Sequence, residues 1–209
     1  MDIIFADDAF QHRKLSRNLD IVILDCLAEK SEYHPIPMGR ARESLESLNR
    51  ADFVIFNRKN LADKKLVSDL ESELKNLNFN MNNCIGCDYH VKFLSKIDGS
   101  ERSRVIDDEK ILLVSGVGTP KSVELVLPNL NIVEHSVYPD HHRYDSVDVQ
   151  EILTLAQKNS VDKILVTQKD AIKLQSFKQL SQKVWVMDLE PTLSPSVQRL
   201  HEAVAALVR

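Results

Sequence analysis

The sequence lacks an uninterrupted apolar run of the roughly 18 to 20 residues that a helix needs to cross a bilayer. It contains only three cysteines, and we expect no signal peptide, so a disulfide framework is not predicted and a reducing cytoplasm fits best. A net charge of -4 and a pI near 6.0 give no overall attraction to nucleic acid or to an anionic membrane. Any contact with a membrane is therefore expected to be peripheral, and we expect no nucleic-acid partner.

A second absence concerns nucleotide binding. No GxxxxGK(S/T) segment occurs in the 209 residues. Without the backbone amides and the lysine of such a loop, the phosphates of a nucleotide have no cradle. We therefore do not expect catalysis on ATP from this chain alone.

The cysteine pair Cys84 and Cys87 forms a CxxC, which can indicate zinc or redox chemistry. No second pair follows at ligand spacing, and the segment resembles a strand rather than the start of a helix. The pattern favours two buried or half-exposed thiols over a metal site.

The composition, 43% hydrophobic and 28% charged, is that of a globular protein, and the length allows one large domain or two small ones. Short apolar runs alternate with helical stretches. The runs lie at residues 3–6, 21–24, 53–56, 111–114, 164–166 and 184–186. This rhythm predicts an α/β fold, with parallel sheets flanked by helices.

Helices are predicted where apolar residues recur at helical spacing. One lies between Leu61 and Leu77, and a second contains Val123, with Thr119 placed as its N-cap and Pro120 in its first turn. A third, amphipathic helix is predicted over residues 194–209.

The middle of the chain, residues 84–106, reads as two strands joined near Asp98 and Gly99, a dipeptide suited to a tight hairpin turn. We therefore divide the chain into four parts. These are residues 1–82 as a first α/β unit, 83–107 as a two-stranded linker, 108–193 as a second α/β domain and 194–209 as a closing helix.

Two aspartates, Asp7 and Asp8, follow the apolar run at residues 3–6 directly. Carboxylates at the carboxyl end of a parallel strand lie where open α/β sheets bind ligands, and two of them suit Mg²⁺. An acidic pair that caps the next turn would have the same sequence. The pair alone leaves both interpretations open.

The following residues add an amide, an imidazole and a guanidinium, from Gln11, His12 and Arg13. Such a cluster suits the ordering of phosphate and metal-bound water. The heptapeptide DDAFQHR, followed by the apolar segment 19–25, resembles the DD(G/A)FQHR signature of the tetraacyldisaccharide 4'-kinases. This long match is far more specific than two adjacent aspartates.

Residues 39–43, GRARE, are similar to the PAGRLRE loop of that family, in which an Arg-Glu pair lines the active site. The resemblance implies that Arg42 meets phosphate, which a guanidinium can clamp with two hydrogen bonds, and that Glu43 lies beside the nucleotide. An exposed loop in which Glu43 begins a short helix is the structural alternative.

Two further segments agree with the family in order and spacing. Residues 115–120, SGVGTP, resemble its (A/S)GIGNP turn, which we interpret as structural. Residues 167–173, TQKDAIK, resemble TEKDAVK, with Gln168 in place of the usual glutamate and Thr167 as the N-cap of a helix. We expect the substitution to leave the fold intact.

Asp140, His141 and His142 resemble the DH motif of the family, and a histidine beside a carboxylate can relay protons. The resemblance implies that His141 pairs with a catalytic aspartate upstream of Met1, with Asp140 beside it. Two solvated histidines in a loop are the alternative.

The resemblance as a whole implies an enzyme that transfers the γ-phosphoryl group of ATP to the 4'-hydroxyl of an acylated glucosamine disaccharide phosphate. Its cofactors would be ATP and Mg²⁺, with Asp7 and Asp8 at the metal, Gln11 and His12 arranging its shell, and Arg42 at the phosphate. The site would face the inner membrane from the cytoplasm.

The family also begins with a membrane-associated helix and a phosphate loop that this sequence lacks, so residues 1–82 are expected to be the C-terminal part of the kinase core. We expect either a truncated kinase or a split enzyme whose N-terminal half is a separate partner chain. Two other interpretations remain. One is a non-catalytic homologue that binds the acylated sugar or a partner chain, and the other is an α/β protein acting on a different phosphorylated molecule.

Overall fold

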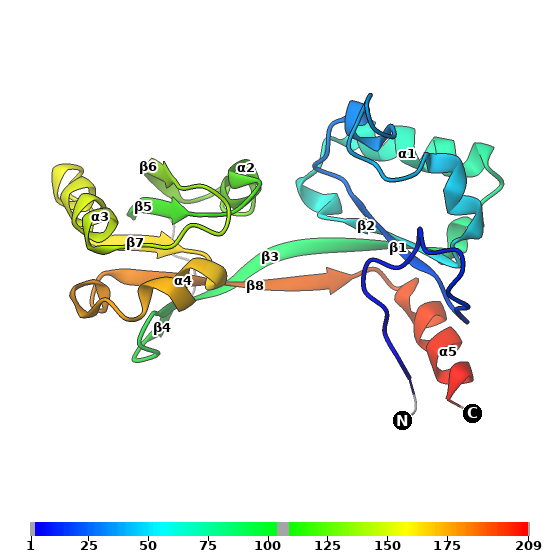
Figure 1. Cartoon of the computed structure of the whole chain (residues 1–209). Helices are drawn as coiled ribbons and strands as arrows, with labels where there is room; N and C mark the ends of the chain where they lie inside the picture. Colours follow the sequence, from blue (N-terminus) through cyan, green and yellow to red (C-terminus); the bar gives the residue numbers. More distant parts are fainter. Residues whose placement is uncertain (1–2, 104–108, 209) are drawn as a thin grey trace. The chain divides into compact units, whose positions relative to one another are not determined.

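The computed structural model describes residues 3–103 and 109–208, in which the chain forms two compact units (Figure 1). The first comprises Met1–Tyr89 with Pro191–Arg209, and the second His90–Glu190. The strands are β1 Ile21–Asp25, β2 Phe53–Asn57, β3 Cys84–Lys96, β4 Arg102–Ser103, β5 Lys110–Ser115, β6 Asn131–Val137, β7 Lys163–Val166 and β8 Val184–Leu193. The helices are α1 Lys64–Asn76, α2 Pro120–Leu125, α3 Ser146–Lys158, α4 Gln168–Leu174 and α5 Val197–Leu207, and 3₁₀ turns cover Lys30–Tyr33, Leu45–Arg50, Lys59–Leu61, Met81–Asn83 and Lys178–Leu180.

The first unit is built on three parallel strands in the order β1-β2-β3. Helix α1 begins at Asp63, whose side chain accepts the amide of Lys65, and turns Val67, Leu70 and Leu74 into the core. Helix α5 adds a second apolar contact, because its Leu200 packs with residues of β2 and β3. Both ends of the chain therefore contribute to this unit.

The second unit contains parallel strands in the order β8-β7-β5-β6. Strand β5 is buried along almost its whole length, as its unbroken apolar run predicts for a central parallel strand. Helix α3 begins with a capping box between Asp145 and Asp148 and buries Val149 and Ile152 against the sheet. The α/β class predicted from the sequence is confirmed.

Most predicted elements are present, but the prediction of a strand at residues 3–6 is wrong. These residues form no strand, and Ile4 and Phe5 are 79% and 83% exposed. A strand is stabilised by hydrogen bonds to a neighbouring strand, so an apolar run alone does not create one. No strand in the described ranges 3–103 and 109–208 pairs with this run. Asp7 and Asp8 consequently follow an extended segment rather than a strand end.

The structure also tests two finer predictions, the N-cap at Thr119 and the hairpin turn at Gly99. Thr119 stands at the N-cap of α2, as expected, but its side chain makes no capping hydrogen bond. Gly99 adopts a φ of +73° in the turn between β3 and β4, which confirms the predicted hairpin turn. Residues 104–106 of the expected second strand lie outside the described part. The four predicted segments differ from the two compact units and remain a prediction of how the chain is organised.

Candidate active site

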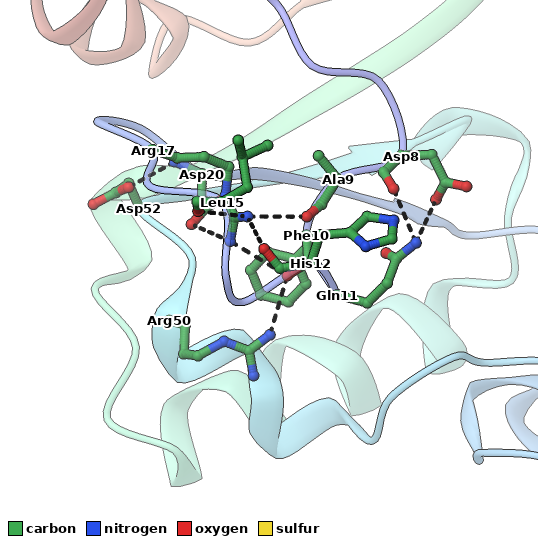
Figure 2. Close-up of polar contacts among 10 residues, drawn as sticks. All are labelled: Asp8, Ala9, Phe10, Gln11, His12, Leu15, Arg17, Asp20, Arg50 and Asp52. Atoms are coloured by element: carbon green, nitrogen blue, oxygen red, sulfur yellow. Dashed lines mark hydrogen bonds and ion pairs between the residues drawn. The ribbon is translucent and has the colours of Figure 1, made fainter.

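The DDAFQHR segment forms a compact turn in the first unit (Figure 2). Asp8 adopts a left-handed backbone conformation, with φ of 52°, which aspartate tolerates better than most residues. The amide of Gln11 donates to the carbonyl oxygen of Asp8 at 2.9 Å, and the backbone amide of His12 donates to Ala9 at 2.9 Å. These bonds turn the chain sharply after the two aspartates.

The carboxylate of Asp8 forms an ion pair with the guanidinium of Arg42, so the structure joins two of the predicted site residues. Both side chains are more than half exposed, which leaves them open to a ligand. Asp7 and His12 are also exposed. These four predicted site residues are therefore accessible to solvent in the first unit, and two of them, Asp8 and Arg42, are in contact.

Arg17 lies at the centre of this turn (Figure 2). Its Nε and Nη2 atoms lie 2.6 and 3.3 Å from the two carboxylate oxygens of Asp20. The same guanidinium donates to the backbone carbonyl oxygens of Ala9, Phe10, His12 and Leu15, at 3.0, 3.4, 2.8 and 3.2 Å. A single side chain therefore binds four backbone carbonyl oxygens within residues 9–15.

Glu43 connects this segment to the loop that carries Arg42. Its carboxylate accepts from Arg50 at 2.9 Å and from Arg13 at 3.4 Å. The hydrogen bond from Arg50, with the positive charges of Arg50 and Arg13, holds the pKa of Glu43 below its ordinary value. Arg50 also stacks over the ring of Phe10, with 4.4 Å from its Cζ atom to the ring centroid. Glu43 is thus occupied by protein cations.

The loop before Arg42 is tightly folded. The amides of Arg40 and Ala41 donate to the carbonyl oxygens of Glu32 and His34 at 3.1 Å each. Gly39 lies so close to the backbone of this turn that a Cβ atom would overlap the carbonyl oxygen of His34. Only glycine fits there, which explains the glycine of the GRARE segment.

In the second unit, Asp140 and His141 occupy a turn after β6. His141 has φ of 60°, and its side chain is 85% exposed. The carboxylate of Asp140 accepts from the backbone amide of His141 at 3.0 Å, whereas the His141 ring nitrogen lies 3.8 Å away. That separation exceeds a hydrogen bond, so in this structure Asp140 holds the backbone of His141 rather than its ring.

The neighbouring His142 is held far more firmly. Its Nε2 atom lies 2.8 Å from the carboxylate of Asp148, and its ring stacks on Tyr138 and meets Tyr144 edge-on. Burial opposes ionisation of Asp148, but the amide of Asp145 and the His142 ring together keep its pKa below the ordinary value. His142 thereby anchors the turn that exposes His141.

Asp170 connects three motifs of the second unit. It is fully buried and accepts hydrogen bonds from the amide of Gly116, the phenol of Tyr144 and the hydroxyl of Thr167, at 3.1, 3.1 and 2.7 Å. Thr167 in turn caps α4, as predicted. The SGVG turn, the DHHRY turn and the TQKD segment are therefore tied to a single carboxylate.

Comparison with known proteins agrees with this set of motifs. The model of the family described as tetraacyldisaccharide-1-P 4'-kinase, LpxK, matches residues 1–209. The chain belongs to this family. It is 33% identical over 216 residues to the tetraacyldisaccharide 4'-kinase of Bdellovibrio bacteriovorus, with 100% of this chain and 61% of the relative covered. The kinase of Halothermothrix orenii is 29% identical, with 94% of this chain and 56% of the relative covered.

A solved structure has the same fold. The LpxK of Aquifex aeolicus, described as an "apo" form in complex with ATP, matches with a TM-score of 0.62 and 21% identity, over 97% of this chain and 56% of that one. At this identity the likeness establishes the fold alone. The present chain thus spans little more than half the length of the relatives and of the structure that it matches.

Within this member of the tetraacyldisaccharide 4'-kinase family, the unusual Gln168 has a local explanation. Its amide donates to the carboxylate of Asp188 at 3.2 Å, and Asp188 also pairs with Arg102 at 2.7 Å. A glutamate at position 168 could not donate this bond and would bring a second negative charge to Asp188. The fold is intact with glutamine, as expected.

Ser115, His135 and Glu124 form a hydrogen-bonded chain that sequence reasoning missed. The Ser115 hydroxyl lies 2.8 Å from Nε2 of His135, whose Nδ1 lies 2.6 Å from Glu124. The order of groups resembles that of a hydrolase triad. Ser115 is fully buried, however, so its hydroxyl cannot reach a substrate, and the chain joins β5, β6 and α2 instead.

Metal ligation was predicted for Asp7 and Asp8, and their oxygen donors suit Mg²⁺, which is commonly bound by one or two carboxylates with waters and substrate phosphates. Across residues 3–103 and 109–208, no group of three or more histidine, cysteine or acidic side chains is placed to hold a metal ion. Among the helices described, none has both the length and the apolar character needed to cross a membrane.

Proposed function

We propose that this chain contributes to the transfer of the γ-phosphoryl group of ATP to the 4'-hydroxyl of a tetraacylated glucosamine disaccharide 1-phosphate. The observation that carries the proposal is the family match over residues 1–209. The exposed pair of Asp8 and Arg42, in the segments that resemble the signatures of the family, supports it.

The first unit would supply groups for the nucleotide. Bound Mg²⁺ would neutralise charge on the transferred phosphoryl group, and Asp7 and Asp8 are the carboxylates that would hold it. Arg42 would exchange its contact with Asp8 for a phosphate oxygen, since a guanidinium binds either anion with two hydrogen bonds. Gln11 and His12 would orient ligands beside them, and Glu43 would fix the arginines around the site.

The second unit would supply the proton-transfer group. His141 is exposed on a turn whose backbone is held by Asp140, and a neutral imidazole can accept the proton of a hydroxyl. We propose that the active enzyme also needs a phosphate-binding loop, supplied by a separate or attached N-terminal half. It would act on the inner membrane surface from the cytoplasm.

The test is transfer of labelled phosphate from ATP to the tetraacyl disaccharide 1-phosphate in the presence of Mg²⁺. It should compare the chain alone with the chain joined to the part of the Bdellovibrio bacteriovorus relative outside the matched region. We expect transfer only in the joined form and its loss in Asp8→Ala. Asp162→Ala, at an exposed position of the second unit, is the matched control and should retain activity.

A second candidate is a non-catalytic homologue that binds the acylated sugar. It is favoured by the lack of a GxxxxGK(S/T) segment in these residues. Absence of transfer in every form, together with retention of the chain on vesicles that contain the tetraacyl disaccharide 1-phosphate, would support this candidate and reject the kinase.

A further inference from the structure

We propose that Arg17 is a positioning residue for the segment 8–15, and that it sets where Asp8 and His12 lie in the site. Only one part of the inference rests on the proposed function, namely the expected effect of Arg17 on the rate of phosphate transfer. Its structural content, that one partly buried guanidinium determines the conformation of the segment, can be tested without substrate. Neither the motif nor the family match assigns a role to this residue.

The first argument is the number and kind of its contacts. An arginine offers five N–H donors in a planar fork, and Arg17 directs them at a carboxylate and at the carbonyl oxygens of one turn. The side chain is only 16% exposed, so water replaces few of these bonds. Hydrogen bonds from a charged donor are about twice as strong as neutral ones.

The second argument is where the contacts lie. Ala9 and His12, two of the carbonyl acceptors, also accept the backbone amides that form the turn, from His12 and Leu15 respectively. Arg17 therefore donates to the same carbonyl oxygens that accept the backbone hydrogen bonds of the turn. Asp8 and His12 project from that turn, so their direction follows from its conformation (Figure 2).

The third argument is that Arg17 is itself anchored to the sheet. Its partner Asp20 donates its backbone amide to the carboxylate of Asp52 at 2.8 Å. The carbonyl oxygen of Asp20 accepts the amides of Asp52 and Phe53 at 2.9 and 3.2 Å, where β2 begins. The segment is thus fixed through Arg17 and Asp20 to the start of two parallel strands.

Lysine cannot reproduce this arrangement, because its three donors lie on one nitrogen atom and cannot reach the Asp20 carboxylate and all four carbonyl oxygens that the guanidinium fork binds. Arg17→Lys is therefore the decisive variant. Asp20→Asn, which keeps the size of the side chain but removes the ionic partner, tests the same link from the other side. Arg143→Lys makes the same arginine-to-lysine change at an exposed position of the second unit and is the matched control.

Hydrogen exchange of the whole chain, followed by mass spectrometry, measures the effect. In Arg17→Lys we expect the amides of residues 9–15 to exchange about tenfold faster or more, while those of β1, β2 and α3 stay unchanged. Asp20→Asn should give the same pattern, and the double variant should add little to either change. Unchanged exchange in residues 9–15 would overturn the proposal. So would a uniform rise across the first unit, which would make Arg17 a general stability residue.

Kinetics of the joined form that transfers phosphate give the second measurement. Small displacements of reacting groups lower rates by about 10²-fold, so Arg17→Lys should lower kcat by that order with the KM for ATP little changed. A raised KM with unchanged kcat would reject the positioning role. If no form transfers phosphate but exchange of residues 9–15 still rises in Arg17→Lys, the proposed kinase function fails while the structural inference stands.

Discussion

The carboxylate of Asp170 accepts a hydrogen bond from the phenol of Tyr144 at 3.1 Å, although the two residues are 26 positions apart in the chain. The Nζ atom of Lys173 lies 3.6 Å from the same carboxylate. Burial and the neighbouring Asp170 charge raise the pKa of the Tyr144 phenol, so it remains a donor at any ordinary pH. The second unit therefore depends on a buried acid that must stay fully bonded.

Removing that acid should destabilise the second unit strongly. In Asp170→Ala the amide of Gly116 and the phenol of Tyr144 lose their acceptor in a buried place, and we expect a loss of about 3–5 kcal/mol in the free energy of unfolding. Tyr144→Phe removes one donor only and should cost about 1 kcal/mol. Urea unfolding can be followed by the fluorescence of Trp185, the single tryptophan. An equal effect of Asp162→Asn, at an exposed aspartate, would contradict the explanation.

Two glycines of the SGVG turn should differ in their tolerance of alanine. Gly116 is buried, and a Cβ atom there would lie 3.1 to 3.3 Å from the buried side chains of Asp170 and Tyr144 and from the carbonyl oxygen of Pro139. We expect Gly116→Ala to cost about 1–3 kcal/mol. At exposed Gly118 the close neighbour is the Asp140 carboxylate at 3.2 Å, so Gly118→Ala should cost under about 1 kcal/mol. The same urea titration ranks the two, and the reverse order would refute the packing argument.

The first unit should lose a specific contribution to stability in acid. Because Arg50 holds the pKa of Glu43 below its ordinary 4.5, the ionised carboxylate stabilises the folded state at any pH above that value. This contribution disappears as the pH falls through the lowered pKa. Unfolding free energies of the parent and of Glu43→Gln, measured by circular dichroism, should therefore differ by a constant amount above pH 4.5 and converge below it. Glu29→Gln, at an exposed position, should produce no such convergence.

The cysteines should resist alkylation in the folded protein. Burial raises the pKa of Cys26 to about 12 and that of Cys84 to about 11, from an ordinary value of 9.0, and it also raises the pKa of Cys87. Since the thiolate is the reactive form, the shift at Cys84 alone slows reaction by about 10²-fold near pH 8. Iodoacetamide labelling with and without urea, resolved by peptide, measures each site. Fast labelling of native Cys84 would revive the redox interpretation of the CxxC.

The sequence alone predicted two kinds of element correctly: a strand in the centre of a sheet and a helix whose cap is formed by nearby residues. The apolar run at residues 111–114 became β5, because a strand paired on both sides can be apolar throughout. The segment TQKD became a capped helix because Thr167 and Asp170 bond to each other within one turn. The family signatures implied that Asp8 and Arg42 belong to one site, and in the structure the two side chains form an ion pair.

What the sequence could not give depends on contacts between distant positions. The run at residues 3–6 has the composition of a strand but forms none, since pairing decides the outcome. Sequence analysis did not identify Arg17, because only the folded turn shows that its side chain binds backbone carbonyl oxygens such as those of Ala9 and Phe10. The sequence predicted Thr167 as the cap of a helix that contains Asp170, but it did not show that Asp170 accepts hydrogen bonds from donors 54 and 26 positions away.

The joining of both chain ends in the first unit has a consequence for how the protein is made. Leu200 of α5 packs with Phe53 and Ile85, and Ser196 donates its hydroxyl to the carbonyl oxygen of Cys84 at 2.8 Å. The second unit is therefore an insertion within a discontinuous first one. A ribosome releases the whole inserted unit before it releases α5. The first unit can complete this part of its core only after α5 has left the ribosome, and a fragment that stops at Tyr89 would leave this apolar contact unmade.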